Sequence, residues 1–440
     1  MFSLYLLTML KTTAASLLIL FLFNNSIYAQ PKTNPVLTSI LNTNTNPVLQ
    51  MVLKQPGTYR LQIIYTQINR DKNNVPSFAN YYYNYDPDLY FNPASTVKMP
   101  LAFLALEKLN TMKVKGVNKY TTIQFDSSYG GQRSAYKDST SANGLPSIAH
   151  YIKKAFLISD NDAYNRFYQF VGQQTINRNL LDKGYKDVRI TRQFMGFTED
   201  ENRHTNAIRF IDKEGRLIYR QPPAYNTDSF DFSHVVKLGR AHMNSKDSLV
   251  NEPFNFTKHN NVSLEDYQQI LQSVLFPASV PAKQRFNISR DDESFLMQYL
   301  SQYPSETNYP KYDTSKYYDS YVKFFFRDST HRMPANVRVF NKVGWSYGFL
   351  TDISYVVDLK NNVEFMLAAT VYVNSDGILN DGKYDYNSIG YPFLYQLGQT
   401  IYKYELRRNR TYKPKLDRFR LKYERRDAND KRAEIRDADN

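Results

Sequence analysis

Ser95 and Lys98 stand three positions apart at the start of an apolar stretch that runs to Leu106. Residues at positions i and i+3 share one face of a helix, so the Lys98 amine can lie over the Ser95 hydroxyl. A serine hydroxyl is a weak nucleophile at neutral pH and needs a base beside it. A helix N-terminus also carries partial positive charge, which suits negative charge developing on an acyl group under attack. The spacing therefore predicts a nucleophile, Ser95, with Lys98 as its partner.

This spacing alone is weak evidence, because it recurs in the chain as Ser134 with Lys137 and as Ser320 with Lys323. Ser95 also has an ordinary structural explanation, since serine is a favoured residue at the N-cap of a helix. On this one motif, the catalytic and the capping interpretations are equally good. Other parts of the chain have to separate them.

Two further motifs follow in order. Ser159-Asp-Asn161 lies in a predicted loop between two helices, and Lys342-Val-Gly344 lies on a predicted strand. Alone, the first is as well explained as a helix breaker and cap, and Lys342 as a solvated strand lysine. Their common order, on elements of the expected type, favours one shared site.

The three motifs together resemble the set found in the penicillin-recognising serine enzymes, and in particular in the class A β-lactamase-like serine hydrolases. The resemblance covers roughly residues 50–405 and includes the longer matches Ile158–Asn165 and Lys342–Asp352. It implies a serine hydrolase that forms an acyl-enzyme on Ser95. The most direct reading of the resemblance is hydrolysis of a β-lactam, which is a cyclic amide.

The resemblance also implies a role for each residue of the first two motifs. Ser95 attacks the acyl carbonyl, and Lys98 removes the serine proton, directly or through water. Ser159 passes a proton to the leaving nitrogen. Asn161 holds an amide of the substrate's side chain.

The third motif completes the implied site. Lys342 supplies positive charge near Ser159 and the substrate carboxylate, and Gly344 allows the substrate to approach the strand backbone closely. The backbone N–H groups of Ser95 and Trp345 form the oxyanion hole, at about 3 kcal/mol for each donor.

Two departures from the family pattern bear on substrate and turnover. Val343 stands where the family usually has a threonine or serine whose hydroxyl can contact a substrate carboxylate. Class A enzymes also place a glutamate, usually two residues past an arginine, that activates the water for deacylation. Here the segment Val188–Arg192 resembles the start of that loop, but Gln193, Phe194 and Met195 follow it.

The acids nearest to this loop are Glu199, Asp200 and Glu201, and we include Glu199 in the predicted catalytic set. An exposed acidic loop explains these residues at least as well. If no acid reaches the site, deacylation is slow. The protein would then be a penicillin-binding D,D-peptidase or esterase-type acylase, or a degenerate protein that binds cell-wall peptide.

Strands near both ends of the chain with helices between them predict an α+β fold, in which an antiparallel sheet is flanked by helices with a helical lobe. The predicted strands lie at 59–68, 81–90, 337–344, 351–359 and 363–374. The predicted helices lie at 35–54 with a break at Pro47, from Ser95 to 109, and at 147–158, 163–171, 233–244, 263–275 and 391–404. Pro100 predicts a distorted or 3₁₀-like first turn in the second of these helices. We expect one domain over 30–405, with an insertion at roughly 206–334.

The N-terminal segment predicts export. Ala14–Phe23 is an apolar run, preceded by Lys11, that is too short to span a bilayer and fits a signal peptide over residues 1–29. The chain has no cysteine, in keeping with a protein exported to the periplasm or beyond without disulfides. An uncleaved N-terminal anchor is the alternative.

Much of the net charge of +14 lies in the tail, residues 406–440, where acids are interleaved with the bases. This pattern is typical of a solvated tail, with weak attraction to the envelope as the functional alternative. We expect a monomer whose partner is a small β-lactam or a cell-wall peptide, and no nucleic acid. The six histidines show no ligand spacing, so we infer no metal and no cofactor.

Overall fold

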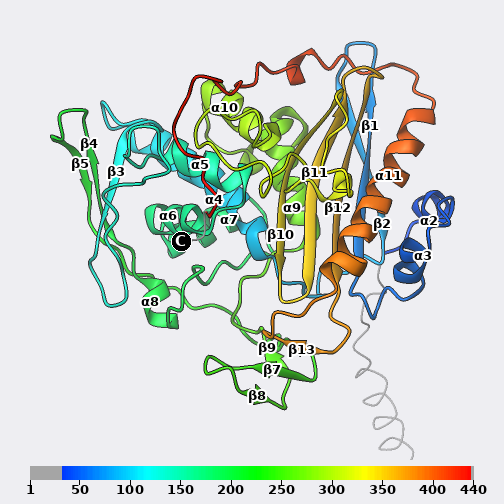
Figure 1. Cartoon of the computed structure of the whole chain (residues 1–440), viewed down its shortest axis with the longest axis horizontal. Coiled ribbons are helices and arrows are strands. Elements are labelled where there is room, and N and C mark those ends of the chain that lie inside the picture. The colour runs from blue at the N-terminus through cyan, green and yellow to red at the C-terminus, as the bar shows by residue number, and fades with distance from the viewer. Residues whose placement is uncertain (1–31, 438–440) are drawn as a thin grey trace, which may run out of the picture.

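A five-stranded antiparallel sheet forms the centre of the computed structural model, which describes residues 32–437 (Figure 1). Its strand order is β10-β11-β12-β1-β2. The strands are β1 (Gln62–Arg70), β2 (Pro76–Tyr83), β10 (Val337–Ser346), β11 (Phe349–Asp358) and β12 (Val363–Tyr372). The N-terminal hairpin and the C-terminal meander therefore meet where β1 pairs with β12, with Ile64 opposite Ala368.

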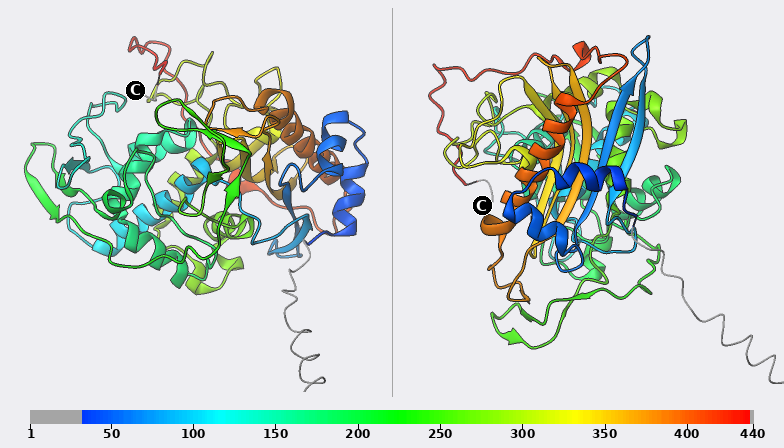
Figure 2. Two further views of the ribbon diagram at one scale, coloured as in Figure 1. Left: turned by 90° about the horizontal axis from the view of Figure 1, so that it is seen from below. Right: turned by 90° about the vertical axis from the view of Figure 1, so that its right-hand side faces the viewer.

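Three helices cover one face of this sheet: α2 (Pro35–Asn42), α3 (Pro47–Lys54) and α11 (Tyr391–Arg407) (Figure 2). The predicted break at Pro47 is confirmed. Asn46 caps α3 through its side-chain oxygen, which accepts hydrogen bonds from two backbone N–H groups of the first turn. Val343, Leu367 and Leu397 are among the buried residues between the sheet and these helices.

A helical lobe covers the other face (Figure 1). It consists of α4 (Lys98–Met112), α5 (Ile148–Leu157), α6 (Asn161–Val171), α7 (Gln173–Asp182), α9 (Leu264–Leu275) and α10 (Arg290–Ser301). Helix α9 packs on β11 and β12, and α4 is buried on almost all sides. The predicted α+β fold with a helical lobe is confirmed.

Short elements surround the lobe. They are β3 (Thr122–Asp126), α8 (Glu199–Arg203), β4 (Ala207–Ile211), β5 (Leu217–Gln221), β6 (Lys237–Leu238), β7 (Ala241–Met243), β8 (Leu249–Val250), β9 (Phe254–Asn255) and β13 (Ile378–Leu379). The predicted helix at 233–244 is wrong, because β6 and β7 occupy that segment. Gly239 turns the chain between them with φ +76°, and a Cβ there would lie 2.7 Å from the Gly377 carbonyl oxygen.

The predicted signal segment, 1–29, lies outside the described residues. In the tail, Leu416 and Phe419 are buried, and the Phe419 ring packs 4.9 Å from that of Tyr355 on β11, so this part is not simply solvated. None of the helices within residues 32–437 is long and apolar enough to cross a membrane.

Candidate active site

Ser95 lies in a 3₁₀ turn, η1 (Ala94–Val97), that leads directly into α4. The distorted first turn expected from Pro100 is thereby confirmed. The N-cap residues are Pro93 for this turn and Val97 for α4, so the capping explanation for Ser95 does not hold. Ala94 has φ +44°, and its N–H donates to Asn92 Oδ1 at 2.8 Å. Such strained backbone often marks a functional site.

The structure brings five predicted polar residues of the three motifs together. Nζ of Lys98 lies 2.7 Å from Ser95 Oγ and 2.8 Å from Asn161 Oδ1. It also donates to the backbone carbonyl of Ser159. From the opposite side, Nζ of Lys342 donates to Ser159 Oγ at 2.8 Å. The Lys98 side chain is fully buried, so its amine is held among these acceptors.

The second motif lies in the tight connection between α5 and α6. Ser159 has φ +67°, a left-handed conformation that is costly for a residue other than glycine. Asp160 follows it as the N-cap of α6, with Oδ1 accepting from the Ala163 N–H at 2.8 Å. Lys154 lies 3.4 Å from the other oxygen of Asp160. This capping fixes the loop and keeps Ser159 facing both lysines.

Lys342 reaches the cluster from the edge strand β10. Its side chain is 2% exposed. Burial, and secondly the charge of Lys98, lower the pKa of the Lys342 ammonium well below its usual value. The next residue, Val343, is buried in the core on the α11 face of the sheet, so its side chain does not line the cavity described below.

Gly344 is required for a reason that the sequence did not indicate. A Cβ at this position would lie 2.6 Å from the carbonyl oxygen of Pro93 and 3.0 Å from the amide nitrogen of Ser95. Both are backbone atoms, and displacing them would cost conformational free energy. Glycine here allows the turn of the nucleophile to pack on β10, whereas we had expected it to admit the substrate.

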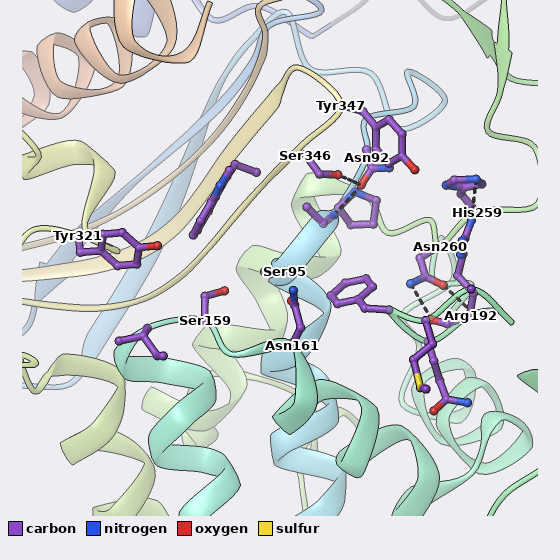
Figure 3. A pocket seen from close by; sticks show the side chains of 18 of the residues that line it. Asn92, Ser95, Ser159, Asn161, Arg192, His259, Asn260, Tyr321, Ser346 and Tyr347 are labelled. Carbon is purple, nitrogen blue, oxygen red and sulfur yellow. Dashed lines mark hydrogen bonds between the residues drawn. The ribbon is translucent and has the colours of Figure 1, made fainter. Parts of the chain in front are cut away.

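A cavity of about 580 Å³ opens over this cluster (Figure 3). Ser95, Ser159, Asn161 and Trp345 all line it. Aromatic side chains form much of its wall: Phe194, Tyr317, Tyr321, Trp345 and Tyr347. No Asp or Glu is among the described residues that line it.

Glu199 is the predicted catalytic residue that the structure does not bring to the cluster. It lies in the first turn of α8, exposed to solvent, and its carboxylate pairs with Lys258 at 2.5 Å. The neighbouring Glu201 is used in a capping box with Thr198. The helix start and the ion pair hold both acids outside the cavity, and we correct the assignment of Glu199 accordingly.

Phe194 occupies the position beside the base instead. Its ring centroid is 5.3 Å from Nζ of Lys98, and it stacks on Tyr164 at 4.2 Å. The backbone of Phe194 is held by Asn165, whose Oδ1 accepts the Phe194 N–H at 2.8 Å. This is the residue that follows Arg192 by two positions, where the family pattern has its glutamate.

The sequence did not single out Arg192, His259, Tyr317 or Tyr321 as site residues, yet all four line the cavity. Only Arg192 had a signal, as the end of the loop-like segment. His259 and the two tyrosines come from the long segment between the second and third motifs, where no spacing marks them.

The two other serine–lysine pairs of the sequence, Ser134 with Lys137 and Ser320 with Lys323, do not belong to the site. Ser134 and Lys137 are exposed on a loop. Lys323 is buried and donates to the carbonyl of Leu300 and to Oδ1 of Asn341, which ties its segment to β10. Neither pair lines the cavity.

Residues 49–213 match the family described as the β-lactamase enzyme family. This match confirms the resemblance to β-lactamase-like serine hydrolases over the part of the chain that carries the first two motifs. No curated protein is significantly similar to the chain in sequence.

Three solved structures illustrate how distant the structural similarity is. A β-lactamase from Sphaerobacter thermophilus DSM 20745 is 14% identical, with 81% of this chain and 96% of that chain covered and a TM-score of 0.43. The TLA-1 extended spectrum β-lactamase is 13% identical, with coverages of 82% and 98% and a TM-score of 0.46. A class A β-lactamase from Clostridium kluyveri DSM 555 is 12% identical, with coverages of 80% and 98% and a TM-score of 0.43. Similarity at this level carries no conclusion about activity or substrate.

Proposed function

Since residues 49–213 match the β-lactamase enzyme family, we propose that the protein is a serine hydrolase that forms an acyl-enzyme on Ser95. The contact of 2.7 Å between Lys98 Nζ and Ser95 Oγ carries this proposal. A nucleophile and its base have to lie within about 2.6–3.2 Å of each other. The acyl donor is a β-lactam or a cell-wall peptide, both of which present an amide carbonyl.

Ser159 links the two lysines in the proposed acylation step. Its Oγ is 3.4 Å from Lys98 Nζ and 2.8 Å from Lys342 Nζ. Lys98 takes the hydroxyl proton as Ser95 Oγ bonds to the acyl carbon, and Ser159 gives a proton to the nitrogen as the amide bond breaks. An ammonium whose pKa is lowered releases its proton more readily, so Lys342 suits the replacement of the Ser159 proton.

Deacylation distinguishes the candidate functions. A water that attacks the acyl-enzyme gains about 10²- to 10⁴-fold from a general base. Among residues 32–437, no carboxylate lines the cavity, and the Phe194 ring lies beside Lys98. We therefore favour an acylase of the penicillin-binding type with slow deacylation over the efficient β-lactam hydrolysis that the sequence put first.

β-Lactam hydrolysis remains the second candidate because the Lys98 amine touches Ser95 Oγ and can activate water once the acyl group is in place. A degenerate protein that only binds cell-wall peptide is the third. The intact contact between Ser95 and Lys98 speaks against it, since a binding protein has no need of an activated serine.

Incubation of the purified protein with benzylpenicillin, followed by intact-protein mass spectrometry, tests the proposal. We expect one adduct that maps to Ser95 and persists after excess penicillin is removed. Fast loss of the adduct, with turnover of a chromogenic cephalosporin, would instead identify a β-lactamase. Absence of any adduct with penicillins and with peptide esters would contradict an acyl-enzyme mechanism.

A further inference from the structure

The C-terminal tail does not extend into solvent after α11 but runs back across the sheet and over α10 into the helical lobe (Figure 1). Its first part is anchored by Phe419, whose ring packs 4.9 Å from that of Tyr355 on β11. Beyond this anchor, residues 424–437 follow the segment 302–321, which lies between α10 and β10, and we call residues 424–437 the strap. The strap therefore ends against a part of the chain that also lines the cavity.

Arg426 is the central tether of the strap. Its Nη2 donates to the carbonyl oxygen of Pro304 at 3.0 Å and to that of Tyr312, while its Nη1 pairs with Glu434 at 3.0 Å. An arginine can serve three acceptors in this way, because its guanidinium carries five N–H donors in one plane. One side chain thus ties two parts of the strap to two points of the segment 302–321.

Backbone pairing supplies a second tether. The Ile435 N–H donates to the carbonyl oxygen of Lys311 at 2.8 Å, and the Asp313 N–H donates to the carbonyl oxygen of Ile435 at 3.0 Å. These two bonds flank Tyr312 and form a parallel bridge between it and Ile435. The strap therefore fixes the backbone on both sides of Tyr312.

Tyr312 connects the strap to the aromatic wall of the cavity. It is fully buried, and its ring lies 5.3 Å from that of Tyr317. The Tyr317 ring lies 5.3 Å from that of Tyr321, which meets Trp345 edge to face at 6.0 Å. Tyr317, Tyr321 and Trp345 all line the cavity. Ring contacts thus continue from the strap to β10, the strand that carries Lys342.

The segment that carries Tyr317 and Tyr321 has little regular structure of its own. Residues 302–323, all of which the structure describes, form no helix or strand, and the one β-bridge among them is the pairing with Ile435. A segment without a hydrogen-bond ladder of its own takes its position from its neighbours and opens locally when they are removed. The strap is such a neighbour.

We propose that the strap positions the aromatic wall of the cavity, with Arg426 and Ile435 as its positioning residues, so that the affinity of the site for its acyl donor depends on the C-terminal tail. For the donor, this inference rests on the proposed function of Ser95. Ser95 and Lys98 are placed by η1 and α4 rather than by the segment that the strap holds. The strap should therefore govern binding of the donor and leave the chemical step unchanged.

A double variant of the full chain detaches the strap and leaves the Phe419 anchor in place. Arg426→Met removes the donors to Pro304 and Tyr312, and Ile435→Pro removes the N–H that pairs with Lys311. The wall is observed directly, because Trp345 is the chain's single tryptophan and lines the cavity. We expect its emission to shift to longer wavelength and its quenching by acrylamide to increase, since the indole becomes more hydrated. Emission and quenching equal to those of the wild type would overturn the proposal.

The second measurement separates binding of the donor from chemistry. The rate of Ser95 acylation by benzylpenicillin is followed by intact mass over a range of concentrations. We expect the half-saturating concentration to rise about threefold to tenfold, as loss of aromatic contacts predicts, and the maximal rate to change less than about twofold. A lower maximal rate at unchanged half-saturation would overturn the proposal. If benzylpenicillin fails to acylate even the wild type while the Trp345 shift occurs, only the proposed function is rejected.

The matched control is Arg425→Met with Ala433→Pro, which makes the same kinds of change at exposed positions of the tail. It should behave as the wild type in both measurements. Arg426→Lys keeps the charge and a donor for a carbonyl, so we expect it to retain most of the wild-type emission. A merely structural tail would lower the unfolding temperature in the double variant without moving the Trp345 emission of the folded protein.

A milder variant covers the case in which the double variant does not fold. Arg426→Met alone keeps the backbone pairing of Ile435 and should shift the Trp345 emission in the same direction by a smaller amount. Wild-type emission in this folded variant would remove Arg426 from the proposal and overturn it.

Discussion

Gly344 on β10 packs directly against the backbone of Ser95. A Cβ atom at Gly344 would stand 3.0 Å from the Ser95 amide nitrogen, and only backbone atoms lie on both sides of this contact. The strand that carries Lys342 and the turn that carries the nucleophile are therefore in direct backbone contact, with no side chain between them. This contact sets the distance over which Ser159 has to join the two lysines.

Gly344→Ala should damage stability and acylation together. The new methyl group would lie 2.6 Å from the carbonyl oxygen of Pro93, and neither the strand nor the turn can yield cheaply. Overpacking of this kind costs about 1–3 kcal/mol. Urea unfolding measures the loss of stability, and the rate of Ser95 acylation measures the displacement of the turn.

Gly57→Ala is the matched control, because a Cβ there meets no atom within 4 Å and no positive φ is required. We expect it to leave acylation unchanged and stability unchanged or slightly raised. Wild-type behaviour of Gly344→Ala in both measurements would show that the packing of η1 on β10 is looser than the structure has it.

Ser95→Ala should abolish the penicillin adduct with little effect on folding, since Ser95 is only partly buried and caps no helix. Intact mass gives the first result, and thermal unfolding gives the second. Ser134→Ala, which removes the hydroxyl of an exposed serine–lysine pair, should label like the wild type. An adduct that survives in Ser95→Ala protein would assign the nucleophile elsewhere.

Lys98→Met should slow acylation by about 10²- to 10⁴-fold, the usual contribution of a general base. The Lys98 amine is the polar group 2.7 Å from Ser95 Oγ, and methionine fills a similar volume without a proton acceptor. The rate of adduct formation measures the effect. Lys137→Met is the control, and a fall of less than threefold for Lys98→Met would remove Lys98 from the mechanism.

The candidate site could be predicted as far as its chemistry is local in the chain. The two polar groups of the first motif are three residues apart, and the second motif is a short loop, so each motif could be recognised locally. That Ser95, Lys98, Ser159 and Lys342 would meet was predicted from the order of the three motifs and the family resemblance that this order carries. Glu199 was chosen only because it is near Arg192 in the chain. The ion pair with Lys258, from a segment far along the chain, holds it elsewhere, and no sequence pattern shows that pairing.

The fold, like the site, was predictable where the signals are local in the chain and was missed where long-range contacts decide. The meander β10-β11-β12 and the break before α3 were predictable, because apolar runs joined by short turn sequences and helix-starting prolines are local signals. The segment 233–244 has apolar residues at helical spacing but forms β6 and β7, since Gly239 packs against the distant Gly377. The walls of the cavity come from such long-range contacts and were missed for that reason.

Asp266 should make stability depend on pH. Burial, first of all, raises the pKa of its carboxyl to about 7, against an ordinary value near 4 in the unfolded chain. A raised folded-state pKa contributes stability that is complete below about pH 4 and is lost as the pH rises through about 7. Asp266→Asn should remove this pH dependence. The total loss in the free energy of unfolding that it removes is on the order of a few kcal/mol, because one pKa unit corresponds to about 1.4 kcal/mol.

Urea unfolding at several pH values between about 4.5 and 8 measures the slope. Asp247→Asn is the control, since Asp247 is an exposed aspartate between β7 and β8. It should keep the wild-type slope. If Asp266→Asn and the wild type lose stability in parallel over this range, Asp266 is not the group responsible.

Phe194→Glu should convert slow deacylation into turnover. Phe194 lies beside Lys98, and its backbone is held by Asn165, so a glutamate there would place a carboxylate near the acylated serine. A general base for the attacking water accelerates hydrolysis by about 10²- to 10⁴-fold. The measurement is the decay of the benzylpenicillin adduct after removal of excess drug. Phe194→Gln has nearly the same shape without the charge, so equal acceleration by both variants would attribute the slow step to exclusion of water by the ring rather than to a missing base.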